Sequence, residues 1–432
     1  MAEYLMGIDA GTGSVRVALF DFRGQNRAYA VAEYGTTYPK NGWAEQSDYE
    51  WFEALKKAIP ECIKKAGIAA DNIAAITCDA TTNTLVYLDE NDTSVRPPIL
   101  WMDVRATEEA SFIDTIREEY DATKFYKPGF RADTMVPKCM WVKKNEPENW
   151  AKTKTIMEFE DWLNWKLTGR KTVSMSVAAF RWNYDDKNGG YPVDFYNAVG
   201  LDDVVDKFPE PVLKVGEVVG NISAEAAEIF GLSKKTVVVE GTADCNACMF
   251  GVGGVRPNGM TLIGGTSTCL LGLSEEEFHV DGVNGTYPNC MYDGTSLLEG
   301  GQTAAGSILT WFKNNLLPAA WMQEAVNRNM NIYDLITEKA SAVPIGCDGL
   351  VMMDYFQGNR APYADSKARG MFWGLSIGTT PAHLARAVYE GVAYGANHCI
   401  VSMKKAGYDV KEIYACGGLA QSDFWMQMHA DI

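Results

Sequence analysis

The chain has 432 residues and a formal net charge of −17, with 47% apolar and 22% charged residues. A chain of this length is expected to form two or three domains, at about 100–200 residues per domain, and the composition is that of a globular protein. A surface with such an excess of negative charge repels phosphate backbones and anionic lipids. We therefore expect neither nucleic acid nor a membrane as a partner.

The first thirteen residues lack the basic region and following apolar stretch of a signal peptide. An uninterrupted apolar run of about 18 residues, long enough to span a membrane, does not occur in the sequence. The ten cysteines are scattered along the chain, and without a secretory signal we expect them to be reduced and mostly buried. These features together predict a cytoplasmic protein.

The first predicted elements are a strand over residues 4–8, a turn of small residues over 9–14 and a second strand over 15–21. The turn over 22–25 that follows is typical of a hairpin. The hydrophobic spacing then predicts two helices and two more strands, the strands again flanking a turn of small residues. The helices are expected over 49–66 and 108–119, and the strands over 73–77 and 85–88.

A similar succession begins near the middle of the chain. A β-branched run at 236–239 is followed by strands at 260–263 and 269–273, which flank the small-residue turn Gly264–Thr268. Each half therefore starts with a strand, a Gly-Thr turn and a second strand, although a loose likeness of this kind leaves duplication and coincidence both open. The mixture of strands and helices favours the α/β class, and the boundary between the halves is expected within 216–254.

The first turn has the composition of a phosphate-binding loop. Glycines let backbone N–H groups approach phosphate oxygens without a Cβ in the way, and the hydroxyl groups of the turn are further donors. Asp9 could hold Mg²⁺ through water, because Mg²⁺ keeps much of its hydration shell. An ordinary glycine-rich hairpin is the alternative interpretation. The candidate phosphate contacts are Gly11, Thr12, Gly13, Ser14 and Arg16.

Two more glycine-containing segments could bind other parts of a nucleotide. The turn after the strand at 260–263 offers Gly265, Thr266 and Ser267, and a later strand–turn–helix junction offers Gly417, Gly418 and Gln421. The dinucleotide-binding fingerprint fits poorly, since Arg16 stands where its third glycine belongs and a strand follows instead of a helix. The Walker-type loop is absent from the sequence, because no Gly-Lys-Ser/Thr follows a glycine at the required spacing.

Asp244 is the candidate acid–base residue. It follows a predicted strand and is surrounded by small residues, which would leave room for a substrate hydroxyl within hydrogen-bond reach. The alternative is an aspartate that caps the helix predicted over 245–250, and both roles can coexist. Cys245 and Cys248 form a CxxC pair, but without matching ligands elsewhere they are better interpreted as small core residues than as a zinc or redox site.

Taken in order, these segments resemble the FGGY family of carbohydrate kinases, in the actin-like ATPase superfamily. The resemblance runs along nearly the whole chain and includes the family's C-terminal signature. Its motifs correspond to Asp9–Arg16, Gly42–Gln46, Trp101–Arg105, Asp244, Gly265–Thr268, Gly370–Leu375 with 383–390, and Gly417–Asp423.

This resemblance implies a two-domain α/β protein with the actin-like ATPase (ribonuclease H-like) fold, a duplicated mixed-sheet core and an interdomain cleft. Residues 1–245 would form the sugar-binding domain and 246–432 the nucleotide-binding domain. Asp244 would be the catalytic base and would hold Mg²⁺ with Asp9, while ATP would contact the three glycine-containing segments. The implied sugar contacts are Asp79, Trp101, Asp103 and Glu299. From the residues alone, Trp101 and Asp79 could instead be core and turn residues, and Asp103 and Glu299 could be solvated or salt-bridged.

Within the family, several segments look most like ribulokinases and related pentulose kinases, namely 78–81, 137–143, 299–302 and 358–365. The expected activity is therefore ATP-dependent phosphorylation of a primary hydroxyl of a pentulose such as ribulose. Two departures from that pattern concern the sugar. Cys245–Ala247 replaces an Ala-His-Ala segment, and the lysine that contacts sugar in some relatives either corresponds to Arg181 or has no equivalent.

Other acceptors stay open, namely xylulose, erythritol and glycerol. A non-kinase actin-like ATPase, a sugar-binding pseudoenzyme and a nicotinamide dehydrogenase are rivals from other classes, and the dehydrogenase is disfavoured by the poor fingerprint. The small sugar or polyol is the expected partner, and a homodimer is possible. The family pattern continues for several tens of residues past the last motif, so we expect the nucleotide domain to be truncated at Ile432.

Overall fold

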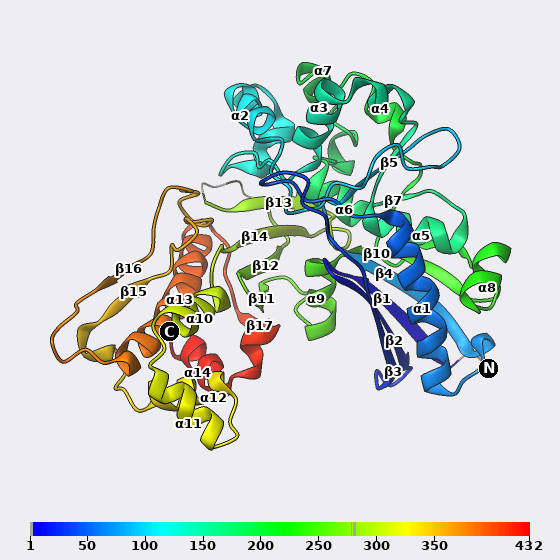
Figure 1. The fold of residues 1–432 in the computed structure, drawn as a ribbon. Helices are drawn as coiled ribbons and strands as arrows, with labels where there is room; N and C mark the ends of the chain where they lie inside the picture. The colour runs from blue at the N-terminus through cyan, green and yellow to red at the C-terminus, as the bar shows by residue number, and fades with distance from the viewer. Residues whose placement is uncertain (1–2, 278, 280–281) are drawn as a thin grey trace. The chain divides into compact units, whose positions relative to one another are not determined.

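The computed structural model describes residues 3–277, 279 and 282–432 (Figure 1). Their contacts divide the chain into two compact units, each with its own sheet. Unit 1 comprises 1–125, 129–247 and 287–297, and unit 2 comprises 126–128, 248–286 and 298–432.

The main sheet of unit 1 has six strands in the order β3-β2-β1-β4-β10-β9. Apolar and polar residues alternate along the first strands, and this period of two buries Ile8 and Val17 completely. β1 and β2 form an antiparallel hairpin, whereas β4 runs parallel to both β1 and β10. The strands are β1 (Tyr4–Ala10), β2 (Ser14–Asp21), β3 (Asn26–Glu33), β4 (Ile73–Ala80), β9 (Val218–Asn221) and β10 (Val237–Ala243).

Helix α1 (Asp48–Ala66) covers β2 and β3, as the apolar spacing predicts. Its Trp51 stacks on Phe159 of α5 (Phe159–Thr168), with ring centroids 3.6 Å apart, and both rings are buried. The N-terminal helices and α5 thus form one core with the sheet. The other helices of this unit are α2 (Thr107–Ile116), α3 (Met135–Asn145), α4 (Pro147–Lys152), α6 (Met175–Arg181), α7 (Val193–Ala198) and α8 (Ala224–Phe230).

The strand predicted over 85–88 exists, but it does not repeat the first hairpin. β5 (Leu85–Leu88) pairs with β6 (Thr155–Glu158) in a separate two-stranded sheet, and β4 pairs only with β1 and β10 among the described strands. All four residues of β5 are buried, and this burial is satisfied by a partner far along the chain. A second small sheet joins β7 (Val173–Ser174) to β8 (Val212–Leu213).

The sheet of unit 2 has the order β13-β14-β12-β11-β17. The long helix α13 (Pro381–Lys405) buries Ala396, Cys399 and Met403 against Met260 and Leu262 of β11. The strands are β11 (Gly259–Gly264), β12 (Thr268–Ser274), β13 (Asn284–Pro288), β14 (Ser296–Gln302), β15 (Val351–Met353), β16 (Met371–Trp373) and β17 (Glu412–Cys416). The helices are α10 (Gly306–Asn315), α11 (Ala319–Asn327), α12 (Ile332–Ser341), α13 and α14 (Asp423–Asp431), and α9 (Asp244–Val252) begins in unit 1 and ends in unit 2.

Short 3-10 helices complete the described elements at Ala70–Asn72, Arg117–Glu119, Asp121–Tyr126, Asp186–Asn188, Val205–Lys207, Cys347–Gly349 and Gly418–Gln421. The second of these takes up the end of the helix predicted over 108–119, so α2 is shorter than expected.

The two sheets repeat one arrangement. In unit 1 the antiparallel hairpin β1–β2 has β4 as the parallel neighbour of β1, and in unit 2 the antiparallel hairpin β11–β12 has β17 as the parallel neighbour of β11. The strand orders β2-β1-β4 and β12-β11-β17 therefore correspond, which confirms the duplicated mixed-sheet core.

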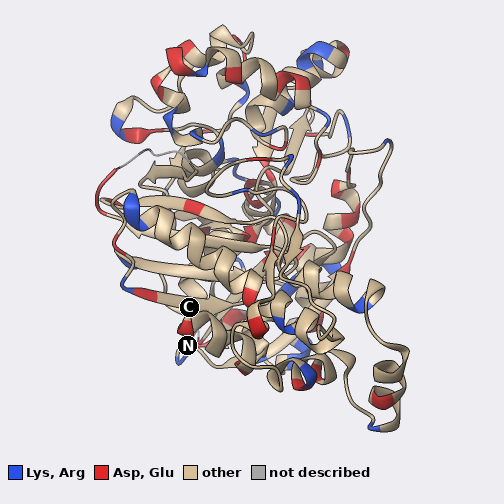
Figure 2. Ribbon diagram, turned by 90° about the vertical axis from the view of Figure 1, so that its left-hand side faces the viewer, with Lys and Arg blue, Asp and Glu red and all other residues tan. Residues whose placement is uncertain are grey.

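Charged residues of both signs are interspersed on helices and loops, whereas the strands are mostly uncharged (Figure 2). Within the described part of the chain, every helix is too short or too polar to cross a bilayer. The ten cysteines are free thiols, and six of them are buried, as the sequence predicts.

Candidate active site

Three predicted site carboxylates lie at the ends of neighbouring strands in unit 1. Asp9 on β1 is aligned with Asp79 on β4, and Thr242 on β10 is aligned with the same Asp79. Asp244 follows β10 directly and is the first residue of α9. Because parallel strands end at the same edge of a sheet, the fold gathers Asp9, Asp79 and Asp244 there.

The charges of these carboxylates act on one another. The pKa of Asp244 is raised to about 6, chiefly by burial and also by the negative charge of Asp9, against the lowering effects of the Cys245 N–H, Arg181 and Arg16. Burial also raises the pKa of Asp79 well above its usual range, and Asp9 and Asp244 add to that rise. A carboxyl with a pKa near the working pH suits proton transfer, so Asp244 has the properties of a general base.

Asp244 also contacts the start of its own helix. The backbone N–H of Cys245 donates to Asp244 Oδ1 at 2.7 Å, which leaves the second carboxylate oxygen available to another group. This bond joins neighbouring residues, whereas a capping side chain accepts from the second or third residue of its helix. Mutual repulsion among the three carboxylates would be relieved by a divalent cation with oxygen ligands, so Asp9 and Asp244 fit a Mg²⁺ site.

The first glycine hairpin is braced by residues outside it. The Tyr34 hydroxyl donates to the Gly11 carbonyl at 2.5 Å and to the Ser14 carbonyl at 3.1 Å. Gln46 Nε2 donates to the Thr12 carbonyl at 2.6 Å. These contacts use carbonyl groups of the hairpin, so they fix its backbone without occupying its N–H groups. Arg16, across the strand pair from Asp9, forms an ion pair with it at 2.7 Å.

Trp101 lies beside this hairpin. Its Nε1 donates to Thr12 Oγ1 at 3.0 Å, and 41% of the residue is exposed. An indole ring that is fixed at one end and exposed on a face can stack against the C–H side of a sugar. Trp101 is therefore placed near the three carboxylates by its bond to the first hairpin.

Asp103 is placed differently, because its carboxylate already has partners. The side chain is fully buried, pairs with Arg105 at 2.7 Å and accepts the Ala44 backbone N–H at 2.6 Å. Arg105 in turn lies over the ring of Trp43, 4.0 Å from the centroid. The segment thus forms a packed ionic cluster, in which Asp103 orders neighbouring residues.

Glu299 lies in unit 2 on β14 and forms an ion pair with Arg360. Its side chain is only 2% exposed. Asp103 and Glu299 therefore share one property, a buried carboxylate held by an arginine, which is the salt-bridged alternative to sugar contact.

The second and third glycine segments meet within unit 2. The Gly265 N–H donates to the Ser267 carbonyl at 2.9 Å and closes the β11–β12 turn. Gly417 has φ +85°, and a Cβ there would lie 2.4 Å from the Gly264 carbonyl oxygen. Only glycine permits this approach, so the third segment lies against the second.

The turn is also held by the start of α10. The backbone N–H groups of Ala305 and Ser307 donate to the Thr266 carbonyl at 2.9 and 3.2 Å, and that of Gly306 donates to the Gly265 carbonyl at 3.0 Å. The fold therefore brings Gly265, Thr266 and Ser267 together with the first turn of a helix.

A cavity of about 550 Å³ opens beside these segments. The predicted residues Gly418 and Gln421 line it, together with aromatic and polar side chains from α12, α13 and α14. A largely preformed pocket with a few polar groups suits a nucleoside. The other lining residues are Leu309, Asn331, Tyr333, Asp334, Thr337, Tyr389, Ser422, Asp423, Phe424 and Trp425.

The sequence did not single out Tyr34, and it did not connect Asn331 or Tyr333 with the nucleotide segments. Tyr34 directly follows β3, a strand of alternating residues, and an aromatic residue there carries no distinctive signal. Asn331 caps α12 and Tyr333 lies in its first turn, so their pattern is that of an ordinary helix start. Gln46 belonged to a recognised motif, and its bond to Thr12 gives that motif a physical role.

Comparison with known proteins agrees with this geometry. The model of the N-terminal domain of the FGGY family of carbohydrate kinases matches residues 4–251, and that of the C-terminal domain matches 260–432. The chain belongs to this family. It is a phosphotransferase with an alcohol group as acceptor and a sugar as its small-molecule substrate, and family membership implies ATP as the phosphoryl donor.

Among the relatives, "Ribulokinase 2" of Staphylococcus saprophyticus is 30% identical over 459 residues, covering 99% of this chain and 84% of the relative. "Ribulokinase" of Shouchella clausii is 31% identical over 467 residues, covering 100% of this chain and 82% of the relative. The solved structure of xylulose kinase from Rhodospirillum rubrum has a TM-score of 0.86 at 27% identity, covering 99% of this chain and 84% of that chain. This FGGY kinase therefore shares both domains with its relatives.

Proposed function

We propose that this FGGY kinase transfers the terminal phosphoryl group of ATP to a primary hydroxyl of a pentulose such as ribulose, with Asp244 as the general base. The observation that carries the proposal is Asp244 itself. It directly follows β10, at the sheet edge where Asp9 and Asp79 lie, and its pKa is raised to about 6, chiefly by burial.

The choice of ribulose is supported by the relatives. Curated proteins named ribulokinase are 30% and 31% identical over essentially the whole chain. Solved structures of xylulose kinases at 26% and 27% identity share the fold. Both names refer to pentuloses, so a five-carbon ketose is the favoured acceptor class, with xylulose as the nearest competitor and erythritol and glycerol as further ones.

In this proposal Asp244 accepts the proton of the acceptor hydroxyl as its oxygen attacks the terminal phosphorus. General-base help of this kind is worth about 10²- to 10⁴-fold. Trp101 and Asp79 are the proposed sugar contacts with accessible or partly buried side chains. Asp103 and Glu299 contribute through their arginine partners, which order the residues around them.

Backbone N–H groups and hydroxyls of the two glycine hairpins are the proposed phosphate ligands: Gly11, Thr12, Gly13, Ser14, Gly265, Thr266 and Ser267. Arg16 adds a cation next to the first of them. The cavity beside Gly417, Gly418 and Gln421 is the proposed adenosine site. Asp9 and Asp244 would hold Mg²⁺, partly through water, and the bound ion would offset negative charge on the transferring phosphoryl group.

The test is sugar-dependent ADP release from ATP and Mg²⁺ with a panel of ribulose, xylulose, erythritol and glycerol. Ribulose should give the highest kcat/KM. The Asp244→Asn variant should keep its sugar affinity, measured by calorimetry, while kcat falls by about 10²-fold or more. A kcat within tenfold of the parent would remove Asp244 from the role of base, and preference for a tetritol or glycerol would overturn the pentulose assignment.

A further inference from the structure

The strand that leads to Asp244 is irregular just before it. β10 pairs in parallel with β4, but the register shifts between Val239 and Thr242, so that Glu240 and Gly241 form a bulge. Bulges often occur next to active sites, where they change the direction of the side chains that follow. The bulge in β10 lies three residues before Asp244 and therefore sets the direction in which the chain enters α9.

Gly241 is the tightest position of this bulge. A Cβ at Gly241 would lie 1.8 Å from the Cys78 carbonyl oxygen, so no other residue fits without a shift of β4. Its N–H donates to Glu160 Oε1 at 3.3 Å, and its carbonyl accepts the Ser174 hydroxyl at 3.2 Å. Side chains therefore bind both backbone groups of Gly241, whereas those of Glu240 pair with the backbone of residues 216 and 217.

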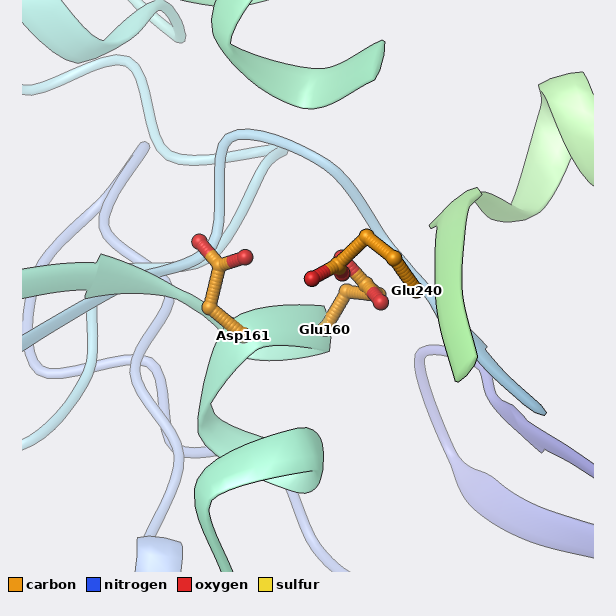
Figure 3. Close-up of side chains that lie close together, drawn as sticks. All are labelled: Glu160, Asp161 and Glu240. Atoms are coloured by element: carbon orange, nitrogen blue, oxygen red, sulfur yellow. The ribbon is translucent and has the colours of Figure 1, made fainter. Parts of the chain in front are cut away.

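Glu160 comes from the first turn of α5 and meets Glu240 of the bulge. Figure 3 shows the carboxyl groups of Glu160 and Glu240 side by side, with Asp161 further along the same helix. Asn164 Nδ2 donates to both, at 2.7 Å to Glu160 and 2.8 Å to Glu240. Glu160 and Glu240 are each 1% exposed, and Asn164 is completely buried.

Two buried carboxyls this close are expected to share one proton, because two adjacent charges out of water would repel strongly. Burial raises the pKa of Glu240 to about 8, and burial together with the charge of Glu240 raises that of Glu160 well above its usual range. Both shifts favour protonated carboxyls at neutral pH, so the proton of one carboxyl can be donated to the other in a hydrogen bond. This bond ties α5 to the bulged residue itself.

Asp161 has a separate role. Its Oδ1 accepts the Ser174 N–H at 2.8 Å and its Oδ2 accepts the Glu158 N–H at 3.3 Å. It thereby fixes the residue whose hydroxyl binds the Gly241 carbonyl. Both bonds to Gly241 thus depend on the start of α5.

We propose that Glu160 is a positioning residue for Asp244: it binds the Gly241 N–H and, through a shared proton, the Glu240 side chain, and so fixes the bulge that aims the catalytic aspartate. The proposal rests on the proposed role of Asp244. Glu160 is expected to affect kcat far more than either KM, because it acts on the direction of Asp244 and contacts neither substrate.

The experiment compares Glu160→Leu with Glu160→Gln. Leucine has a similar volume but no acceptor for the Gly241 N–H, whereas glutamine keeps that acceptor and offers an N–H to Glu240 in place of the shared proton. In Glu160→Leu, kcat should fall by at least about tenfold, since a misplacement of about 1 Å can cost about 100-fold. Both KM values should stay within about threefold, and Glu160→Gln should restore most of the lost kcat.

Thr172→Val is the matched control. Thr172 is also completely buried, and its hydroxyl donates to Glu240 Oε2 at 3.3 Å rather than to Gly241. The Thr172→Val variant should have a lower unfolding temperature than the parent, without the loss of kcat expected for Glu160→Leu. Equal losses of kcat in Thr172→Val and Glu160→Leu would show a general structural effect and overturn the proposal, as would equal losses in Glu160→Gln and Glu160→Leu.

A folded Glu160→Leu protein with kcat within about twofold of the parent would also overturn the proposed positioning role of Glu160. If Glu160→Leu fails to fold, the Ser174→Ala variant tests whether the bulge positions Asp244. It removes the second bond to Gly241 with a one-atom change. An unchanged kcat in Ser174→Ala would refute the anchoring of Asp244 by the bulge. The two proposals separate cleanly: loss of kcat in Asp244→Asn but not in the Glu160 variants refutes only the positioning role, and retention of kcat in Asp244→Asn refutes the base.

Discussion

The contact between two glycine segments of unit 2 gives the sharpest prediction, for the variant Gly417→Ala. Gly417 has φ +85° and ψ −169°, a region that residues with a Cβ avoid. Its added Cβ would meet the Gly264 carbonyl oxygen at 2.4 Å and its carbon at 3.1 Å. The loop at 417–421 must therefore move away from the turn at 264–268 or change its backbone angles.

The expected rise in the KM for ATP follows from the backbone strain at residue 417 and from the clash with Gly264. A residue held in such a backbone region costs about 1–3 kcal/mol, and relief of the clash would displace Gly418 and Gln421, which line the cavity. At about 1.4 kcal/mol for each factor of ten, the KM for ATP should rise by roughly 5- to 150-fold. The KM for the sugar should stay near that of the parent, because the proposed sugar contacts Asp79 and Trp101 lie in unit 1.

The assay is steady-state kinetics with ATP varied at saturating sugar, together with thermal unfolding. Gly346→Ala is the control, since Gly346 also has positive φ, +83°, but its Cβ would meet nothing within 4 Å. That variant should lose about 1–2 kcal/mol of stability, without a change in the KM for ATP. A folded Gly417→Ala enzyme whose KM for ATP is within twofold of the parent would refute the assignment of this loop to the nucleotide.

Two further predictions concern titration and buried charge. Because the pKa of Asp244 is raised to about 6 and the base must be ionised, kcat/KM should fall about tenfold per pH unit as the pH drops below that value; a flat profile between about pH 7.5 and about pH 5 would contradict this. Asp103→Asn removes one partner of a fully buried ion pair with Arg105 and should cost about 3 kcal/mol in urea unfolding. An unchanged unfolding midpoint with a raised KM for sugar would instead show that Asp103 contacts the sugar directly.

The local elements were predictable because their signals are local. The period-two alternation of β1 and β2, the small residues between them and the three- and four-residue spacing in α1 each reflect nearest-neighbour geometry. The strand leading to Asp244 was only half predicted. Glu240 and Gly241 are poor strand formers, so the sequence predicts that the strand ends there. In the structure β10 continues to Ala243, because Glu160 and Ser174 hold Gly241 of the bulge.

Partners and charge states required the tertiary structure. The pairing of β5 with β6 replaced an expected repeat of the first hairpin, since a fully buried strand is stabilised by whichever partner packs against it. The arginines that bind Asp103 and Glu299 were likewise not evident from the motifs, because a carboxylate in a sequence motif has the same appearance whether a sugar or an arginine binds it.

By itself, the sequence determined the class of chemistry: the types and order of the glycine turns and of Asp244 indicate a sugar kinase with a duplicated α/β core. The tertiary structure alone decided how Asp244 is aimed and ionised. Residues separated by dozens of positions create the burial and the opposing charges that set a pKa, and the pairing of β4 with β10 brings those residues together.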